Sequence, residues 1–314
     1  MADLAISTCN LTRYFGSKCA VNQVNLQVPR GSVFALLGRN GSGKTTAIRM
    51  LLGLLAPTRG SAEILGCDST KLTAAVRARI GYLTESHFVY GWMRVHECEK
   101  FQSQTFPRWN HKIFSAVVDY FRLDANAKAK DLSRGERAGL CLALTMAPEP
   151  ELLVLDDPAL GLDPVARRAL VEALLAITAK QDRTILFSSH LLDDVERVAD
   201  HIAILDRSVL RVHAPLEEFR ARVERWVLTF PGLPPIPPQI PGLIHARVIE
   251  HELHLTIANP NDTTEAALRE TGALQVVQAP LSLDQAIIDY LGDHSRPSSL
   301  CETISTLAAV TEGH

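Results

Sequence analysis

One eight-residue stretch limits the possible folds of this chain more than any other. It has the pattern GxxxxGK[ST] and consists of Gly38, Arg39, Asn40, Gly41, Ser42, Gly43, Lys44 and Thr45. An apolar run at residues 32–37 precedes it, and a helix-like run at residues 44–52 follows it. Glycines let main-chain N–H groups surround an anion, and the N-terminus of the next helix attracts the same charge. The pattern therefore predicts a strand, a phosphate-binding loop and a helix in succession.

Two adjacent carboxylates follow a second apolar run, residues 152–155 (LLVL). Lys44 of the loop is suited to the β- and γ-phosphates of a nucleotide, and the Thr45 hydroxyl is suited to Mg²⁺. Carboxylates at the tip of a buried strand are costly without partners, and that Mg²⁺ would supply one. Asp156 is then the expected metal carboxylate, acting through water, and Asp157 would face the attacking water. The other interpretation is a surface turn, because Asp-Pro often begins turns.

Five further stretches lie in the order and spacing of the ABC ATPase family, which the chain resembles over residues 1 to about 213. Residues 132–136 (LSRGE) resemble the signature motif, usually LSGGQ, and residues 161–164 (GLDP) resemble the D-loop. Residues 82–85 (YLTE) occupy the place of the Q-loop. His190 resembles the switch histidine, and Tyr14 resembles the aromatic residue that stacks on adenine.

This resemblance implies an α/β fold, a P-loop NTPase domain of the ABC type over residues 1–213 with a helical subdomain at about 86–150. It implies an ATPase that uses Mg²⁺ and pairs with a second subunit, most simply another copy. Each ATP would lie between residues 38–46 of one subunit, Thr46 included, and the helix tip of the other. The contacts at that tip would come from Ser133, Gly135 and Glu136.

Several of these residues also have ordinary structural interpretations. Tyr14 would equally suit a core, His190 a strand end, and Asp163 a turn before proline. In the family, Asp163 would organise the dimer interface and His190 would contact the γ-phosphate. Ser133 and Glu136 form an S-x-x-E capping box, which predicts a helix from about residue 133 to 147 whatever its function.

Three positions depart from the family pattern. Asp157 stands where the family usually has a catalytic glutamate, and its side chain is about 1.5 Å shorter. Because errors of about 1 Å in placement can lower a rate about 100-fold, we expect slow hydrolysis. Glu85 replaces the usual glutamine; its carboxylate would ligate Mg²⁺ or polarise water, or would only mark an exporter-type subfamily. Arg134 replaces the first signature glycine, and both a phosphate-facing and a solvent-facing side chain are open.

Aromatic residues and histidines are frequent in the helical segment after Glu85. In the family this segment forms the groove that accepts a helix of a membrane permease. Phe88, Tyr90 and Trp92 are suitable anchors for such a helix. Packing inside the helical subdomain is the other interpretation.

The C-terminal part is predicted to be a small α+β module at residues 214–292. Six prolines at residues 231–242 exclude a helix there and indicate an extended loop or linker. One strand is expected at 247–257, a helix at 264–270, a strand at 275–277 and a final helix at 282–291. Residues 293–314 read as a flexible tail. The module resembles the accessory extension of exporter-type subunits, with a dimerising or regulatory role.

Composition limits the other classes of function. The formal net charge of −3 gives no basic footprint for nucleic acid. No apolar run approaches the roughly 20 residues needed to span a bilayer, so a membrane role requires a separate permease chain. We expect a cytoplasmic subunit, peripheral on the cytoplasmic face of the membrane, that powers export. The rivals are a soluble ABC ATPase that remodels ribosomes or DNA, and a non-hydrolysing ATP-dependent switch.

Overall fold

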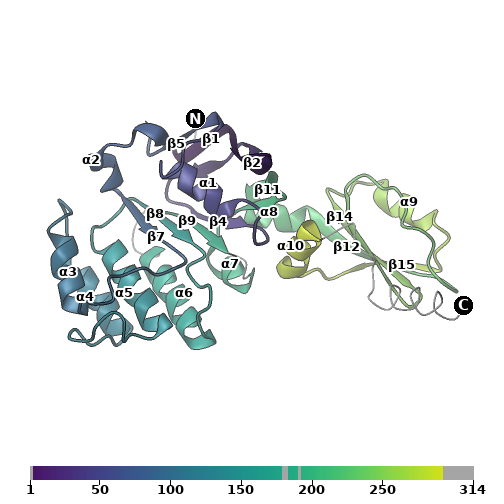
Figure 1. Ribbon diagram of the computed structural model, residues 1–314. Helices are drawn as coiled ribbons and strands as arrows, with labels where there is room; N and C mark the ends of the chain where they lie inside the picture. The colour runs from purple at the N-terminus through teal and green to yellow at the C-terminus, as the bar shows by residue number, and fades with distance from the viewer. Residues whose placement is uncertain (1–2, 179–182, 190–191, 293–314) are drawn as a thin grey trace, which may run out of the picture. The chain divides into compact units, whose positions relative to one another are not determined.

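The computed structural model of the 314-residue chain describes residues 3–178, 183–189 and 192–292 (Figure 1). The fold divides into two compact units, Met1–Leu216 and Glu217–His314, and each is described by itself. The predicted histidine His190 lies outside the described residues.

A six-stranded sheet forms the centre of the first unit, in the order β11-β10-β4-β9-β8-β7. Its parallel strands are β4 (Val33–Leu37), β7 (Ile80–Leu83), β8 (Leu152–Asp156), β9 (Thr184–Ser189) and β10 (His201–Asp206), and β11 (Val209–Pro215) is antiparallel. Every residue of β4, β8 and β9 is buried. Central parallel strands are covered on both faces, which explains why they read as continuous apolar runs.

A second, antiparallel sheet packs over the helix that follows the glycine-rich loop. Its strands are β1 (Leu4–Phe15), β2 (Lys18–Val24), β3 (Gln27–Pro29), β5 (Arg59–Ile64) and β6 (Cys67–Asp68). The helix α1 (Lys44–Leu51) shares one apolar core with both sheets, through Ile48, Met50 and Leu51. This core fixes the start of α1 beside the ends of β4 and β8.

A helical region has its own apolar core. It contains α3 (Val95–Ser103), α4 (His111–Tyr120) and α5 (Arg134–Met146), after the short η1 (Ser69–Lys71) and α2 (Ala74–Arg77). The helices α6 (Pro164–Thr178) and α7 (Leu192–Val198) follow later in the chain. The predicted capping box of α5 is confirmed, since Ser133 Oγ accepts from the Glu136 N–H at 3.2 Å and Glu136 Oε2 accepts from the Ser133 N–H at 2.7 Å.

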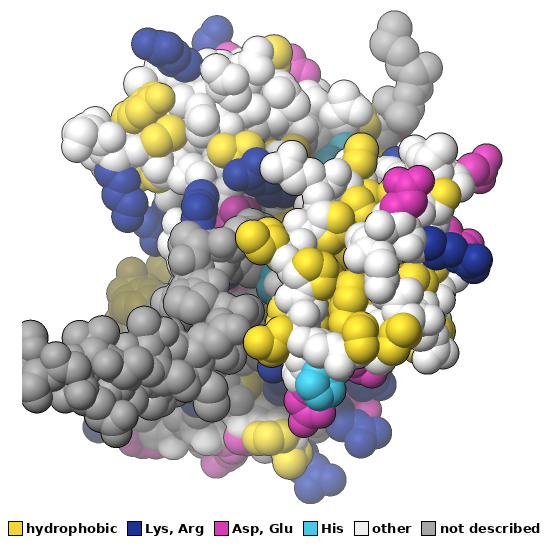
Figure 2. Space-filling view, turned by 90° about the vertical axis from the view of Figure 1, so that its right-hand side faces the viewer, with side chains coloured by type: hydrophobic (Ala, Val, Ile, Leu, Met, Phe, Trp, Pro, Cys, Tyr) yellow, Lys and Arg dark blue, Asp and Glu magenta, His cyan; other side chains and the backbone are white. Residues whose placement is uncertain are grey.

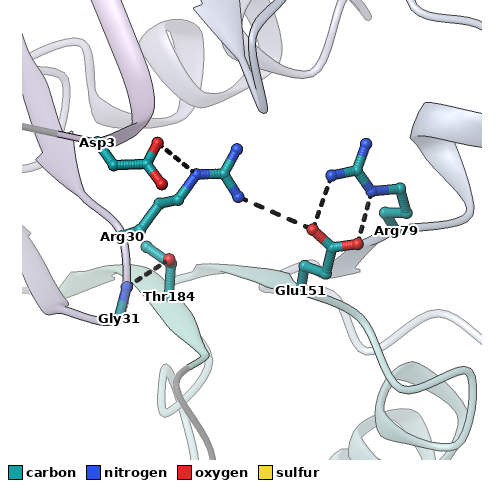
Figure 3. Close-up of polar contacts among 6 residues, drawn as sticks. All are labelled: Asp3, Arg30, Gly31, Arg79, Glu151 and Thr184. Atoms are coloured by element: carbon teal, nitrogen blue, oxygen red, sulfur yellow. Dashed lines mark hydrogen bonds and ion pairs between the residues drawn. The ribbon is translucent and has the colours of Figure 1, made fainter.

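An exposed ion-pair network joins the starts of the central strands (Figure 3). Both oxygens of Glu151 accept from Arg79, at 2.6 and 2.7 Å. Arg30 lies 3.8 Å from Glu151 and donates to Asp3 at 2.9 Å. The network connects the segments that precede β4, β7 and β8. It therefore lies at the amino-terminal ends of these strands, opposite the glycine-rich loop.

The second unit is a four-stranded antiparallel sheet with two short helices. Its order is β13-β14-β12-β15, from β12 (Val223–Thr229), β13 (Leu243–Ile249), β14 (Glu252–Ala258) and β15 (Gln275–Ala279). Its helices are α9 (Thr264–Arg269) and α10 (Leu283–Leu291); α8 (Leu216–Ala221) lies at the boundary of the units. The core of this unit includes Trp226, Leu228, Phe230 and Leu255.

Two details of this unit differ from the sequence prediction. The single strand expected at residues 247–257 was wrong, because the chain turns at Glu250, whose φ is 54°, and forms the hairpin of β13 and β14. The strand β12 was missed. The proline-rich residues 231–242 connect β12 to β13 inside this unit. The predicted final helix is confirmed as α10.

Candidate functional site

A pocket of about 350 Å³ opens where the glycine-rich loop meets the end of β8. The loop, the turn after β8 and the segment after β7 all contribute to it. Its lining residues are Phe15, Lys18, Ala20, Asn40, Gly41, Gly43, Lys44, Thr45, Thr46, Glu85, Asp157 and Leu160. Four of the lining residues were not predicted, because they lie outside the motifs found in the sequence: Phe15, Lys18, Ala20 and Leu160.

The glycines of the loop are required by geometry. Gly38, Gly41 and Gly43 have φ values of 154°, 82° and 112°, where other residues are strained. A Cβ at Gly38 would lie 2.3 Å from the Leu205 carbonyl oxygen, and one at Gly43 would lie 2.3 Å from that of Ala20. The backbone can follow this path only because these side chains are absent.

Lys44 is the buried cation of the site. Its Nζ donates to the Gly38 carbonyl at 2.7 Å and lies 3.9 Å from Asp157 Oδ2. Burial lowers the pKa of Lys44, and the carboxylates of Asp157, Asp156 and Glu85 raise it. An anion in the pocket would stabilise the charged amine, because a buried charge favours a partner of opposite sign.

Asp156 is held by two hydroxyl groups. Its Oδ1 accepts from Thr45 Oγ1 at 3.0 Å and from Ser188 Oγ at 2.9 Å. Burial raises the pKa of Asp156, and those two hydrogen bonds lower it. Thr45 and Asp156 thus present two oxygens side by side, the ligand type that Mg²⁺ prefers. Ser188 was not predicted, although it lies in the strand run before His190.

Asp157 has a constrained backbone at the mouth of the pocket. Its φ is 48°, and its N–H donates to Ser188 Oγ at 2.9 Å. The residue is 8% exposed and lines the pocket. Non-glycine residues in this region are uncommon and concentrate at functional sites, so the turn is a reasonable place for chemistry.

The rest of the loop also suits an anion. Ser42 Oγ is buried and has no hydrogen-bond partner among the described residues. Asn40 and Thr46 line the pocket. Arg39 is exposed, and its carbonyl accepts from the Ser42 N–H at 3.0 Å. Ser42 itself is not among the lining residues, and its Oγ lies beside Gly38, where an added Cβ would be 2.5 Å from it. The loop therefore offers an anion its main chain and the side chains of the lining residues.

The aromatic residue of the pocket is Phe15, and its neighbour Tyr14 is not among the lining residues. The Arg13 guanidinium lies over the Phe15 ring, 4.8 Å from its centre. The sequence Arg13-Tyr14-Phe15-Gly16 offers two adjacent aromatics, and successive strand residues point to opposite faces. The sequence alone therefore does not tell which ring faces the pocket.

Glu85 lines the pocket as an exposed residue, just beyond the end of β7. The signature residues lie elsewhere. Ser133 is exposed at the tip of α5, and a Cβ on Gly135 would lie 2.6 Å from Ala166 Cβ. Ser133, Gly135 and Glu136 do not line the pocket of their own chain.

Asp163 and Arg134 each contact the chain near the start of α6. Asp163 Oδ1 accepts from the N–H groups of Val165 and Ala166, both at 2.9 Å, which caps that helix. A Cβ on Gly161 would lie 2.3 Å from Arg134 Nη1, so the guanidinium rests against the Gly161 backbone. Arg134 is exposed, and its contact with Gly161 was not predicted under either interpretation, facing phosphate or facing solvent.

Known proteins resemble the chain in sequence. A family model described as ABC transporter matches residues 21–160. The bacitracin transport ATP-binding protein BcrA of Bacillus licheniformis is 31% identical, over 71% of this chain and 73% of that protein. The Nod factor export ATP-binding protein I of Rhizobium leguminosarum bv. viciae is 32% identical, over 69% of this chain and 73% of that protein.

Solved structures resemble the chain in fold. An ATP-binding subunit of an ABC transporter has a TM-score of 0.62 at 26% identity, over 69% of this chain and 92% of that chain. A dimeric bacterial ABC transporter cassette has a TM-score of 0.60 at 21% identity, over 67% of this chain and 98% of that chain. The predicted fold class, a P-loop ATPase domain of the ABC type, is confirmed. The chain belongs to the family of ABC transporter ATP-binding proteins.

Proposed function

We propose that the chain binds and hydrolyses ATP, pairs with a second copy in doing so, and drives a separate membrane permease in the direction of export. The observation that carries this proposal is the Lys44 pocket, where a buried amine and the two carboxylates of Asp157 and Glu85 lie beside one glycine loop. The names of the relatives, for bacitracin transport and Nod factor export, support a transporter role.

The pocket assigns a part to each end of the nucleotide. Phe15 would stack on the adenine, because the exposed ring offers a flat apolar surface at the pocket. Residues 38–46 would hold the phosphates. Thr45 and Asp156 would hold Mg²⁺, with Glu85 as a further oxygen at the same pocket. When bound, Mg²⁺ neutralises phosphate charge.

Asp157 would orient the attacking water, at a low rate. Its carboxylate is one methylene shorter than the glutamate usual in the family, and its oxygen lies 3.9 Å from Lys44. His190 is proposed for the γ-phosphate from sequence alone, since it lies outside the described residues.

Pairing would complete each site from the other copy. The helix α5 has thirteen residues, and the exposed Ser133 caps its N-terminus. The positive end of the helix dipole lies there, which suits a phosphate. Ser133 lines no part of its own pocket, which supports a role toward a partner. Asp163 would hold the neighbouring loop of the interface.

The permease would dock on exposed rings after Glu85. Phe88, Tyr90 and Trp92 are 72, 50 and 69% exposed, so packing inside the helical core does not account for them. Their rings form a row, with centres 5.6 and 6.1 Å apart. Such rings are suitable anchors for an incoming apolar helix.

None of the helices in the described part of the chain meets the length and hydropathy that a membrane span requires. In this proposal the chain acts from the cytoplasmic face of the membrane, held there by the permease.

A single-turnover ATPase assay on the purified protein tests this function. With enzyme in excess over ATP and Mg²⁺ present, we expect slow but complete conversion to ADP. ATP that is bound and stays intact would favour the non-hydrolysing switch. Hydrolysis that responds to ribosomes or DNA, and not to a permease in membranes, would favour the soluble remodelling ATPase.

A further inference from the structure

The sheet of the second unit has two edges of different character. β13 and β15 are its outer strands. An outer strand presents a row of main-chain N–H and C=O groups that another strand can pair with. Among residues 3–178, 183–189 and 192–292, no strand pairs with the outer side of β15.

Charge protects one edge and not the other. β13 carries Arg247, and Glu250 follows it directly. The segment from Thr271 to Leu283 contains β15 and has no charged residue. Proteins commonly guard outer strands with charges, prolines or bulges, because unguarded edges pair with other chains. β15 itself contains neither a charge nor a proline.

The unguarded edge is also apolar at its surface. Leu274 and Val277 are 72 and 43% exposed. Val277 lies opposite Val227 of β12, whereas its neighbour Val276 packs on the core of the unit. Figure 2 shows hydrophobic side chains gathered on the face of the second unit that is turned to the viewer.

β15 is complementary to itself. If two copies of this strand pair in antiparallel register about Val277, Val277 faces its own copy and Gln275 faces Ala279. Val276 then faces Gln278 on the other side of the sheet. No like charges meet. The same operation on β13, about its central Ala246, sets each Arg247 opposite His245 of the other copy, so that the guanidinium meets no acidic partner.

We infer that β15 pairs with β15 of a second copy, so that the two accessory sheets form one eight-stranded antiparallel sheet. The contact is isologous, as a twofold dimer requires. A five-residue strand supplies few hydrogen bonds, so the contact alone is weak. It acts by keeping two copies at high effective concentration for ATP-dependent pairing. The contact itself does not need nucleotide.

Sedimentation velocity of the full chain, free of nucleotide and with a chelator, tests the contact. We expect a concentration-dependent monomer–dimer equilibrium for the natural sequence. Val277→Lys places two ammonium groups opposite each other and should raise the dissociation constant by up to about fivefold. Ile249→Lys is the matched control on β13, 40% exposed, and should leave the equilibrium unchanged. Equal behaviour of the two variants, or a natural protein that stays monomeric, overturns the inference.

Hydrogen exchange separates the second copy from other occupants. We expect the amides of residues 275–279 to exchange faster on dilution of the natural protein and in Val277→Lys. The alternative occupant is the chain beyond residue 292. If exchange is independent of concentration and rises only when the chain is ended at residue 292, that segment covers β15 and the inference is wrong. Unchanged protection of the β14 amides in Val277→Lys would exclude a folding defect of the second unit. Failure of the proposed ATPase function would leave these measurements interpretable.

Discussion

The central sheet has charged groups at both ends of its parallel strands, but in opposite arrangements. At the edge where β7 and β8 begin, Glu151, Arg79 and Arg30 form exposed, directly paired contacts. At the edge where β8 ends, Lys44, Asp156 and Asp157 are buried, and Lys44 and Asp157 lie 3.9 Å apart. The first arrangement is complete in itself. The second includes the Ser42 hydroxyl, which has no hydrogen-bond partner within the described part of the chain, and Asp157, whose backbone φ is 48°.

This difference indicates that the exposed ion pairs contribute to stability, whereas the buried charged groups contribute to the reaction. Burial raises the pKa of Asp156 and lowers that of Lys44, so the folded protein disfavours the charges that the reaction uses. The Arg79 contact lowers the pKa of Glu151, so the fold favours that charge. We expect substitutions where β7 and β8 begin to change stability, and substitutions where β8 ends to change activity.

Asp156→Asn should have the largest effect on activity. The amide oxygen can still accept from Thr45 and Ser188, but the negative charge for Mg²⁺ is lost. We expect ATP hydrolysis to fall at least about 100-fold, as for other electrostatic groups of active sites. Thermal unfolding in chelator without nucleotide should show equal or greater stability. A large loss of stability in Asp156→Asn would contradict the proposal that the buried groups serve activity and not stability.

Asp157→Glu should have a smaller effect, in the opposite direction. The longer side chain would reach the attacking water, and we expect turnover to rise several-fold, within the roughly 100-fold range of placement effects. Steady-state ATPase rates with saturating Mg²⁺ give the measurement. An unchanged or lower rate would refute the argument from reach.

Glu85→Gln tests whether Glu85 compensates for the short Asp157. If it does, the variant should hydrolyse ATP more slowly or need more Mg²⁺ for half the maximal rate, because a carboxylate oxygen is lost. An unchanged rate with unchanged magnesium dependence would refute the compensation.

Phe15→Ala and Tyr14→Ala form a matched pair at the rim of the pocket. Loss of the ring that stacks on adenine should raise the KM for ATP by about two- to twelvefold, since aromatic contacts contribute roughly 0.5–1.5 kcal/mol. We expect this rise for Phe15→Ala and little change for Tyr14→Ala, with kcat nearly unchanged in both. The reverse result would restore the assignment made from the sequence.

Glu151→Gln should have the smallest effect, on stability alone. The pair with Arg79 is exposed, so we expect a loss of about 0.5–1 kcal/mol in unfolding free energy and unchanged ATPase activity. Because the pKa of Glu151 is lowered from its usual 4.5, the difference between natural protein and variant should be full above that pH. It should shrink as the pH falls through the lower, folded value. Urea unfolding at pH 7 and at pH 3 measures this.

The sequence predicted the first unit well because its motifs are local. The glycine spacing determines the loop, and the apolar runs determine β4, β8 and β9. Ser188 and Phe15 were missed, because their roles depend on which strand lies beside which and on which face a ring points. The hairpin at Glu250 was missed because its turn carries no glycine or proline, and the φ of 54° is imposed by the pairing of β13 with β14.

Subunit complementation tests the central claim most directly. Lys44→Ala removes the cation of one pocket, and Ser133→Asp keeps a good helix cap while it opposes the partner's phosphate. Each variant alone should be inactive. A mixed dimer would contain one pocket with both natural residues, so we expect the mixture to hydrolyse ATP well above either variant. A mixture that stays inactive, or a Ser133→Asp variant that is fully active by itself, would contradict a site shared between two copies.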